Sequence, residues 1–406
     1  MGFNGVSGRV LLSAERVVAG AGTGWRRLAA AQQPTWPNEQ QADRVRQTLS
    51  GLPGLVSSEE TDELRELLRE VAHGERTIVQ AGDCAEDPAE CNPAQLGTKL
   101  QLLGALTEEL AAVTGLPCTG IGRIAGQFAK PRSHAEETVN GHPLPAFRGL
   151  IVNDPAPNLA ARTHDPRRLV AGYHAAAAAI GFLRGQPRPV WTSHDALVLD
   201  YELPLLRRRP DGRLLLSSTH FPWIGDRTRQ LDGAHVQLLR RIDNPVACKV
   251  GPAIGPAELL ALCELLDPER EPGRLTLIAR LGAGVAERRL PAMAEAVRAA
   301  GHPVIWLCDP MHGNTVRTPD GRKSRVFAQI EQEIGEFCRA VRGAGAVAGG
   351  LHLETTPAAV AECVWSADEL VSLDGRHYTT LCDPRLNAEQ AVRAVRAWLP
   401  DRVVTR

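Results

Sequence analysis

The sequence has no excess of charge of either sign and no hydrophobic run long enough to cross a membrane. Its 406 residues contain 46 Lys and Arg against 47 Asp and Glu, which gives a formal net charge of −1. A balanced chain creates no general field that attracts nucleic acid or anionic membranes. A membrane-spanning helix needs about 20 consecutive apolar residues, and residues 1–18 lack the basic stretch and apolar core of a secretory signal. We therefore expect a cytoplasmic protein without nucleic acid or membrane partners.

The sequence also lacks closely paired cysteines, internal repeats and low-complexity linkers. Its nine cysteines are odd in number and scattered, which argues against a disulfide framework and favours reduced thiols, at least one of them functional. A chain with 43% hydrophobic residues can bury a large core. Residues 1–50 show little sustained periodicity, and a clear helical pattern begins at Ser57. We therefore predict an N-terminal arm over 1–56 and one catalytic domain over 57–406.

Eight apolar, strand-like stretches are spread along the chain. The run from Val304 to Leu307 has no polar residue on either face, which is typical of a strand buried on both sides in a parallel sheet. The eight predicted strands lie at 76–81, 118–126, 189–194, 218–225, 245–251, 274–282, 303–310 and 348–354. Each is followed by a polar cluster, so chemistry is expected at the carboxyl edge of the sheet.

Helical patterns separate most of these strands. The first helix begins with a capping box, Ser57 with Glu60, and closes at Gly74. Further helices are predicted over 256–266, 290–301 and 327–345, and a last one over 387–399. Alternating strands and helices predict an α/β fold, specifically a (β/α)8 TIM barrel with an N-terminal extension and a C-terminal helix.

Four residues near predicted strand ends or in the late CDPRLN segment could bind a metal ion. Cys84, His312, Glu354 and Asp383 offer one sulfur, one imidazole nitrogen and carboxylate oxygens. This mixed set suits manganese, cobalt, iron or zinc better than calcium or magnesium, which prefer oxygen alone. Taken singly, a buried Cys or a hydrogen-bonded His is the ordinary alternative. Their agreement in position favours a metal site.

Four cationic residues also stand at apolar strand ends or beside glycine: Arg123, Arg227, Lys249 and Arg280. Charges in such places are costly unless they are paired. A ligand with phosphate and carboxylate groups would satisfy several of them at once, because guanidinium matches both groups bidentately. Internal salt bridges with Asp83, Asp226, Asp232 or Asp309 are the alternative, and the spacing does not decide between the two.

Long, ordered motifs in the sequence resemble one family closely. They are GDCAE (82–86), GRIAGQFAKPRS (122–133), TSHDAL (192–197), WIGDRTRQLDGAH (223–235), KVGP (249–252), PGRLTLIAR (272–280), CDPMHGNT (308–315), GGLHLE (349–354) and CDPRLN (382–387). Together they resemble the class II, or plant-type, 3-deoxy-D-arabino-heptulosonate 7-phosphate (DAHP) synthases from about Trp25 to Asn387. The resemblance implies a (β/α)8 barrel that condenses phosphoenolpyruvate with erythrose 4-phosphate, the first step of the shikimate pathway.

The resemblance also assigns roles to residues. It implies that Cys84, His312, Glu354 and Asp383 bind a divalent metal, with manganese the expected ion and cobalt, iron or zinc possible alternatives. Arg123, Trp223, Arg227, Lys249 and Arg280 would bind phosphoenolpyruvate, and Lys130, Arg132, Ser133 and Lys323 would bind erythrose 4-phosphate. Arg123, Lys249 and Asp226 are the expected catalytic residues. A carboxylate-bound water near Asp226 is one hypothesis for the attacking water, and a metal-bound water is the other.

The sequence departs from the family pattern in two informative places. Asp195 stands where the family usually carries Glu, which puts substrate preference in question. The stretch from Ser133 to Ser193 is much shorter than in housekeeping members, whose extra helices there contribute to aromatic amino-acid sites. We therefore predict an enzyme insensitive to Phe, Tyr and Trp, of the short kind associated with secondary-metabolite clusters such as phenazine pathways.

Two alternative functions and the oligomeric state stay open at this point. The same site could use an imino form of erythrose 4-phosphate, as an aminoDAHP synthase does, or another aldehyde. A catalytically silent scaffold or activator ranks lower, because none of the expected site residues is lost. The family resemblance favours a homodimer or a higher homo-oligomer, and the arm, with Trp25 and Trp36, is expected to reach a neighbouring subunit.

Overall fold

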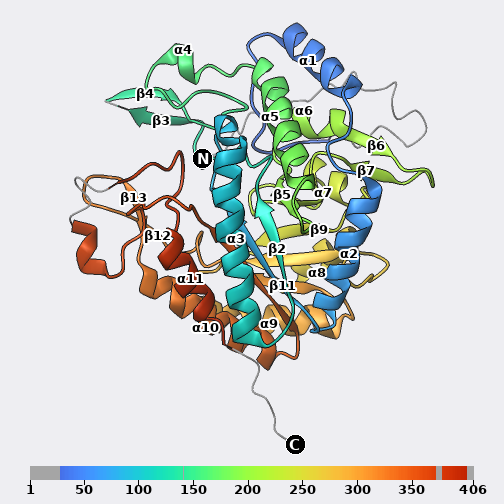
Figure 1. The fold of residues 1–406 in the computed structure, drawn as a ribbon, viewed down its shortest axis with the longest axis vertical. Coiled ribbons are helices and arrows are strands. Elements are labelled where there is room, and N and C mark those ends of the chain that lie inside the picture. The colour runs from blue at the N-terminus through green and yellow to red at the C-terminus, as the bar shows by residue number, and fades with distance from the viewer. Residues whose placement is uncertain (1–27, 140, 372–376, 400–406) are drawn as a thin grey trace, which may run out of the picture.

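A closed barrel of eight parallel strands forms the centre of the molecule (Figure 1). The computed structural model describes residues 28–139, 141–371 and 377–399. The barrel strands are β1 (Thr77–Gly82), β2 (Cys118–Arg123), β5 (Trp191–Asp195), β8 (Phe221–Ile224), β9 (Val246–Val250), β10 (Leu275–Ala279), β11 (Ile305–Cys308) and β14 (Val347–Glu354). Each strand pairs with the next one in this sequence order, and β14 closes the barrel against β1. All eight predicted strands and the predicted (β/α)8 fold are confirmed.

Helices connect successive strands around the outside of the barrel, as in a TIM barrel. They are α3 (Pro93–Thr114), α5 (Arg167–Arg184), α6 (Leu199–Glu202), α7 (Ala234–Leu239), α8 (Pro256–Leu266), α9 (Ala286–Ala299) and α10 (Phe327–Gly343), with short 3₁₀ turns η3 (Pro88–Glu90) and η4 (Leu203–Leu205). After the last strand come the 3₁₀ turn η5 (Ala367–Val371) and the helix α11 (Ala388–Arg396). The helix α11 starts with a capping box at Asn387. The helix α9 begins four residues before the predicted 290–301, and Pro291 is accommodated within it.

Three two-stranded antiparallel sheets extend the loops of the barrel. They are β3 (Glu136–Val139) with β4 (His142–Pro145), β6 (Leu206–Arg208) with β7 (Leu214–Leu216), and β12 (Thr315–Arg317) with β13 (Lys323–Arg325). A short helix, α4 (Leu159–Arg162), follows β4. The β3–β4 and β12–β13 hairpins lie on the same side of the molecule (Figure 1) and both contribute to one cavity.

The predicted N-terminal arm contains a helix that the sequence pattern did not indicate. This helix, α1 (Glu39–Gly51), is capped by Asn38 and buries Ala42, Val45 and Leu49. A buried Arg46 lies on the same face and interrupts the apolar pattern. Its charge is compensated by Asp200 at 3.2 Å.

The arm packs on the same chain at Trp36, whose side chain is buried. The indole nitrogen of Trp36 donates to Asp200 Oδ2 at 2.5 Å. The expectation that Trp36 reaches a neighbouring subunit is therefore wrong. Trp25, the other residue in that expectation, lies outside the described residues.

A helix before β1, α2 (Ser58–Ala72), packs against the amino ends of the strands. Its capping box between Ser57 and Glu60 is present as predicted. Its buried Leu64, Leu68 and Val71 form one cluster with residues of seven strands, namely Ile78, Ile121, Trp191, Phe221, Ala247, Ile278 and Ile305, among others. Backbone atoms of α2 lie so close to Gly273 that a Cβ there would meet Arg69 N at 2.7 Å. The helix therefore plugs the amino end of the barrel.

Side chains inside the barrel change from apolar to polar along several strands. Successive interior positions are two residues apart, because side chains alternate between the two faces of a strand. Ile121 is followed by Arg123, Ala247 by Lys249, Ile278 by Arg280 and Leu307 by Asp309. The polar residue of each pair lies at or just after the carboxyl end of its strand. The barrel thus has an apolar amino end and a charged carboxyl end.

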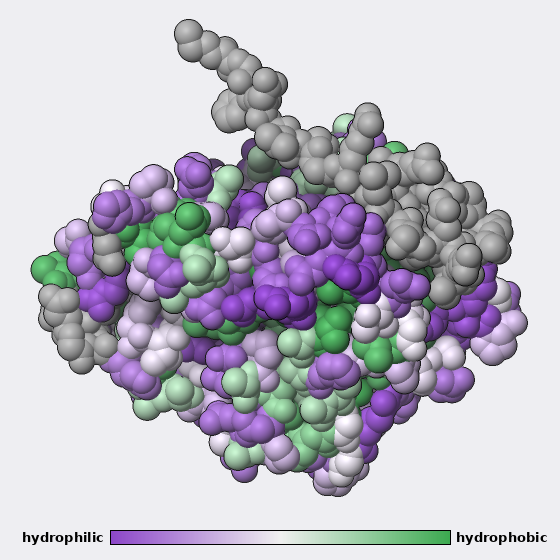
Figure 2. Space-filling model, turned by 90° about the horizontal axis from the view of Figure 1, so that it is seen from above, coloured by the Kyte–Doolittle hydropathy of each residue, from purple (hydrophilic) through white to green (hydrophobic). Residues whose placement is uncertain are grey.

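No helix in the described part of the chain is long and apolar enough to cross a membrane. Hydrophilic residues cover most of the visible described surface in the view from above, and hydrophobic ones form small patches (Figure 2).

Candidate active site

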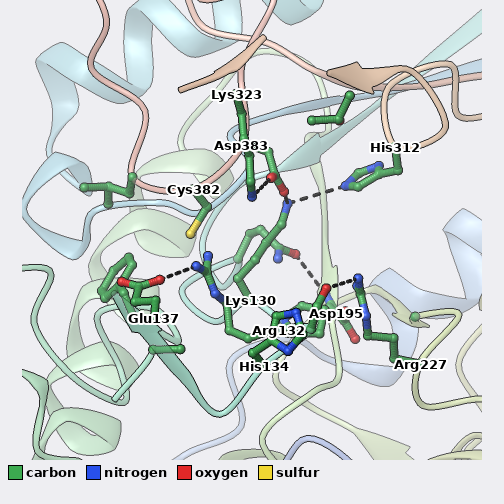
Figure 3. A pocket seen from close by; sticks show the side chains of 18 of the residues that line it. Lys130, Arg132, His134, Glu137, Asp195, Arg227, His312, Lys323, Cys382 and Asp383 are labelled. Carbon is green, nitrogen blue, oxygen red and sulfur yellow. Dashed lines mark hydrogen bonds and ion pairs between the residues drawn. The ribbon is translucent and has the colours of Figure 1, made fainter. Parts of the chain in front are cut away.

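A polar cavity of about 880 Å³ opens at the carboxyl end of the barrel. It is lined by strand-end residues such as Arg123, Lys249 and Arg280, and by the loops that carry Arg132, Lys323 and Asp383. Figure 3 shows side chains from these separate segments pointing into the same space. Every residue predicted for substrate binding lines this cavity, as does Asp226.

Three of the four predicted metal ligands come together. One donor atom each from His312, Glu354 and Asp383 lies within 4.8 Å of the others. The fourth, Cys84, does not belong to that group of atoms, but it is next to it. Its Sγ lies 3.1 Å from Thr380 Oγ1 and accepts from the backbone N–H of Asp383 at 3.4 Å. Burial raises the pKa of the Cys84 thiol, and the charge of Lys130 opposes that rise.

The carboxyl groups of the candidate metal site are in the ionised form that binds a cation. Burial disfavours the charged form of Glu354, but His312, Lys130 and Arg325 lower its pKa well below the ordinary value. The pKa of Asp383 is lowered in the same way, against burial, by Lys130 and other cations. Both carboxyl groups therefore stay ionised at neutral pH and offer charged oxygens.

The imidazole of His312 is oriented by a carboxylate. Its Nδ1 lies 2.8 Å from Asp309 Oδ2, and its Nε2 lies 3.1 Å from Glu354 Oε1. Burial lowers the pKa of His312, although Asp309 and Glu354 oppose this. In the neutral ring, Nδ1–H donates to Asp309 and leaves the Nε2 lone pair facing Glu354. A carboxylate behind a ligating histidine is the usual support of a metal site, so the donor set fits a divalent metal ion.

The ammonium group of Lys130 lies among these ligands rather than apart from them. Its Nζ is 2.5 Å from Glu354 Oε1, 3.1 Å from Asp383 Oδ2 and 3.5 Å from His312 Nε2. Figure 3 shows Lys130 directed toward His312 and Asp383, and Lys323 toward Asp383. The Lys323–Asp383 pair measures 2.7 Å. Lys130 and Lys323 therefore connect the predicted metal site with the predicted aldehyde site.

The cations predicted for phosphoenolpyruvate have internal partners and still face the cavity. Lys249 pairs with Asp309 at 2.9 Å, and Arg280 pairs with Asp226 at 3.2 Å. The two interpretations of these charges, salt bridges and anion binding, are thus compatible. Burial, moderated by Asp309, lowers the pKa of Lys249 to about 8.

Arg227 differs from the other cations because it is exposed. Its Nη2 donates to Ser133 Oγ at 2.9 Å. This contact joins the predicted phosphoenolpyruvate and aldehyde groups, since Ser133 belongs to the second. Arg132, also of the second group, is paired with Glu137 of β3 at 2.5 Å. Arg162 of α4 holds Glu137 from behind. The stretch that is short in sequence therefore supplies a wall of the cavity.

Asp226 is surrounded by donors. Its Oδ1 accepts from Arg229 Nε at 2.8 Å and from the backbone N–H of Gly251 at 3.1 Å, and its Oδ2 accepts from Arg280. This arrangement orients Arg280. That Asp226 binds the attacking water stays a proposal.

Sequence reasoning missed several residues that shape the site. Glu86 is buried and accepts from the backbone N–H groups of Ala125, Gly126 and Gln127, which holds the loop between Arg123 and Lys130. Ala125 has a φ of 66° in this loop. The GDCAE motif includes Glu86, but nothing in its spacing indicates a partner forty residues away.

Two buried charges were also missed or only partly recognised. Arg325 is fully buried and donates to Glu354 Oε2 at 2.9 Å. Asp195 lines the cavity, and its Oδ1 is buried without a hydrogen-bond partner. Burial raises the pKa of Asp195 to about 6, although Lys249 opposes the rise. Arg325 lies at the end of β13, two residues before the predicted helix 327–345, and no pattern in the sequence marked it as buried.

Comparisons with known proteins agree with the geometry. A family model described as the class-II DAHP synthetase family matches residues 21–189 and 186–396. A probable phospho-2-dehydro-3-deoxyheptonate aldolase of Pseudomonas fluorescens is 52% identical over 378 residues, which cover 91% of this chain and 94% of the relative. A phospho-2-dehydro-3-deoxyheptonate aldolase of Streptomyces coelicolor is 38% identical over 428 residues, covering 92% and 95%.

A solved structure supports the fold. A phospho-2-dehydro-3-deoxyheptonate aldolase from Francisella tularensis SCHU S4 matches with a TM-score of 0.52 and 14% identity, covering 88% of this chain and 96% of that chain. At this identity the likeness concerns the barrel architecture alone.

Proposed function

The chain belongs to the class-II DAHP synthetase family, and we propose that it condenses phosphoenolpyruvate with erythrose 4-phosphate and water, giving DAHP and inorganic phosphate. The observation that carries this proposal is the single cavity in which a metal-ligand group adjoins a cluster of cations. A nucleophile with phosphate and carboxylate groups and a phosphorylated aldehyde need both features.

The charges of the cavity support the binding of two anionic substrates side by side. Without positive groups, phosphoenolpyruvate and erythrose 4-phosphate would repel each other, and holding both in register lowers the barrier to their reaction. We assign Arg123, Lys249, Arg280 and Arg227 to phosphoenolpyruvate, with Trp223 as a wall. We assign Lys130, Arg132, Ser133 and Lys323 to the aldehyde and its phosphate.

The proposed reaction forms one carbon–carbon bond, and at carbon 2 a new bond to the oxygen of water replaces the bond to the phosphate oxygen. Carbon 3 of phosphoenolpyruvate attacks the aldehyde carbon, and the aldehyde oxygen takes up a proton to become a hydroxyl group. Water adds to carbon 2 and loses its protons as the ketone forms, and phosphate leaves with its bridging oxygen. Lys130 is a suitable group to hold a proton near the aldehyde oxygen, because its ammonium lies beside the metal-ligand group.

We propose that His312, Glu354, Asp383 and Cys84 hold a divalent metal ion, with manganese the ion to test first. When bound, the metal supplies Lewis-acid stabilisation of the negative charge that develops on the aldehyde oxygen. Asp309 would keep His312 in the required tautomer.

We further propose that the enzyme feeds secondary metabolism, as in phenazine pathways, and is insensitive to Phe, Tyr and Trp. The support for this is the short stretch between Ser133 and Ser193, whose described residues form the β3–β4 hairpin, α4, α5 and the start of β5. A homodimer or higher homo-oligomer is the proposed assembly, and light scattering of the purified protein would measure it.

A second candidate rests on Asp195. It is a shorter side chain than the usual Glu, it lines the cavity, and its Oδ1 is buried without a hydrogen-bond partner. This favours an altered aldehyde preference, including the imino analogue of erythrose 4-phosphate. If an Asp195→Glu variant gained activity with erythrose 4-phosphate and lost it with another acceptor, this candidate would replace the first.

The test of the proposed function is the consumption of phosphoenolpyruvate by metal-stripped protein supplied with erythrose 4-phosphate. We expect turnover that depends on added manganese and does not change when Phe, Tyr and Trp are added together. Inhibition by these amino acids below millimolar concentration would overturn the regulatory part. Absence of turnover with manganese, cobalt, iron and zinc would overturn the condensation with this aldehyde.

The role of Asp226 is tested in the same assay. If its carboxylate binds the attacking water, Asp226→Asn loses most of its turnover, whereas full turnover rules the carboxylate out.

A further inference from the structure

We propose that His352, supported by Gln80, is a positioning residue that aims the guanidinium of Arg123 at phosphoenolpyruvate. The inference rests on the proposed function, in which Arg123 binds that substrate. His352 lies inside the barrel on β14, two residues before Glu354, and its side chain is fully buried.

Three strands bring the three side chains together. His352 on β14 is directly opposite Gln80 on β1, and Arg123 on β2 is opposite Gly82 two residues farther along β1. His352 Nε2 lies 2.6 Å from Arg123 Nη1, and His352 Nδ1 lies 2.6 Å from Gln80 Oε1. The chain of contacts therefore runs across the barrel interior, from β1 through β14 to β2.

The direction of each hydrogen bond follows from the chemistry of arginine. A guanidinium group only donates, so His352 Nε2 must be the acceptor. The ring proton is then on Nδ1, and Gln80 Oε1 accepts it. A flipped Gln80 amide would place its NH₂ group against Nδ1–H, so only one orientation of Gln80 is compatible. Gln80 thus selects the tautomer in which His352 can hold Arg123.

The contacts of Arg123 show what His352 adds. Guanidinium has five N–H donors. Nε donates to Asp83 O at 3.0 Å, and Nη2 donates to Cys84 O at 3.4 Å and Glu354 Oε1 at 3.1 Å. With Nη1 donating to His352, four donors have partners among the described residues. The fifth, also on Nη1, is left for a ligand in the cavity that Arg123 lines. Because the two Nη1 hydrogens are fixed relative to each other, the bond to His352 fixes the direction of the free one.

A neutral acceptor has a specific advantage at this position. An Asp or Glu in its place would add a second carboxylate to Arg123, besides Glu354, and cancel the charge needed for an anionic substrate. The imidazole accepts the hydrogen bond and leaves the charge in place. It also packs edge-to-face on Trp223, with ring centroids 5.2 Å apart and an angle of 88°, and Arg123 lies 5.3 Å from the same indole ring. His352 therefore supports two walls of the phosphoenolpyruvate region.

The experiment compares His352→Leu, which removes the acceptor, with His352→Gln, whose side-chain amide reaches the position of Nε2. His302→Gln is the matched control, because His302 is also buried but lies at the amino end of the barrel, next to Glu264. For each protein, kcat and the KM values for both substrates are measured. Calorimetry of phosphoenolpyruvate binding is measured as well, without the aldehyde.

We expect His352→Leu to raise the KM and Kd for phosphoenolpyruvate about tenfold or more, the effect of losing one buried hydrogen bond to a charged group. The KM for erythrose 4-phosphate should change less than about twofold. His352→Gln should recover most of the loss, and His302→Gln should match wild type. The inference is overturned if His352→Leu binds phosphoenolpyruvate like wild type, if both KM values rise equally, or if Gln is no better than Leu.

A double variant and the calorimetry keep the test decisive. If His352→Leu does not fold because Gln80 loses its partner, the double variant Gln80→Leu with His352→Leu removes both polar groups and is subjected to the same predictions. Absence of turnover in wild type contradicts the proposed function, whereas calorimetry still tests His352. Wild-type turnover together with unchanged binding by His352→Leu contradicts the inference alone.

Discussion

The two ends of the barrel differ in chemistry although the same eight strands build both. At the amino end, Leu64 and Leu68 of α2 pack on Ile78 and Ile305 in an apolar cluster inside the barrel. At the carboxyl end, a few residues farther along the same strands, Lys249, Asp309 and Glu354 are buried as charges. The first arrangement gains free energy by removing apolar surface from water. The second costs desolvation that only mutual pairing offsets.

This difference separates stability from function along one axis. Residues near α2 should contribute to folding and leave kinetics unchanged. Residues at the carboxyl end should control kinetics, and some of them should lower stability. Variants at either end of the barrel test this division.

The largest effect is expected from His312→Ala at the charged end. Loss of the Nε2 donor removes a ligand of the proposed metal site, which contributes several kcal/mol of transition-state stabilisation, or about a thousandfold or more in kcat. Manganese affinity, followed by magnetic resonance of the ion, should fall about tenfold or more. His174→Ala, on the exposed face of α5, is the control that should keep both. A His312→Ala protein with normal manganese affinity would contradict the assignment.

The second effect belongs to the apolar end. Leu68 is fully buried in the plug, so Leu68→Ala should lower the free energy of unfolding by about 3 kcal/mol. Urea denaturation measures this, and both KM values should remain at wild-type levels. Leu67→Ala, one residue away and only partly buried, should cost clearly less. If Leu68→Ala changed a KM value and left the free energy of unfolding unchanged, the separation of stability and function between the two ends would be wrong.

A third variant, Asp195→Asn, tests whether the charged end lowers stability. The folded-state pKa of Asp195 is raised to about 6, so the native state binds its proton more tightly than the unfolded chain does. The contribution of Asp195 to the free energy of unfolding of the wild type therefore falls as the pH rises from about 4 to about 6, and it stays low at higher pH. The side chain of Asn does not ionise, so the Asp195→Asn protein does not lose this contribution. Its free energy of unfolding at pH 8 should exceed that of the wild type by about 1–3 kcal/mol.

The sign of the pH dependence is the decisive feature of that comparison. The advantage of Asp195→Asn should shrink as the pH falls from about 8 to about 4, as urea midpoints at several pH values will measure. An advantage that stays constant, or grows in acid, would show that burial of the Asp195 charge is not its cause.

The smallest effect is expected from Ser57→Ala. It removes the capping box of α2 and should cost about 1 kcal/mol of stability with unchanged kinetics. Ser57→Asp, which keeps an oxygen acceptor at the cap, is the matched control and should lose little. An altered KM in Ser57→Ala would mean that α2 influences the site across the barrel.

Much of this architecture could be predicted from the sequence. The eight apolar runs and the polar residues after them specified the barrel and its functional edge, because strand periodicity and burial are local properties. The helix α1 was missed since Arg46 occupies a core-facing position there. The proposed metal-ligand residues were selected by type and position, and the structure brings His312, Glu354 and Asp383 together. That Cys84 lies outside this group of three could not be known from the sequence.

The sequence by itself determined which residues alternate into the barrel and therefore which end is charged, because that pattern depends only on the two-residue period of each strand. Tertiary structure alone decided which charges meet. Barrel closure places His352 beside Gln80, 272 residues away in the chain, and makes Glu354 the shared partner of Arg123, Lys130 and Arg325. Such contacts depend on the register of strands joined by the closure, and no local pattern records that register.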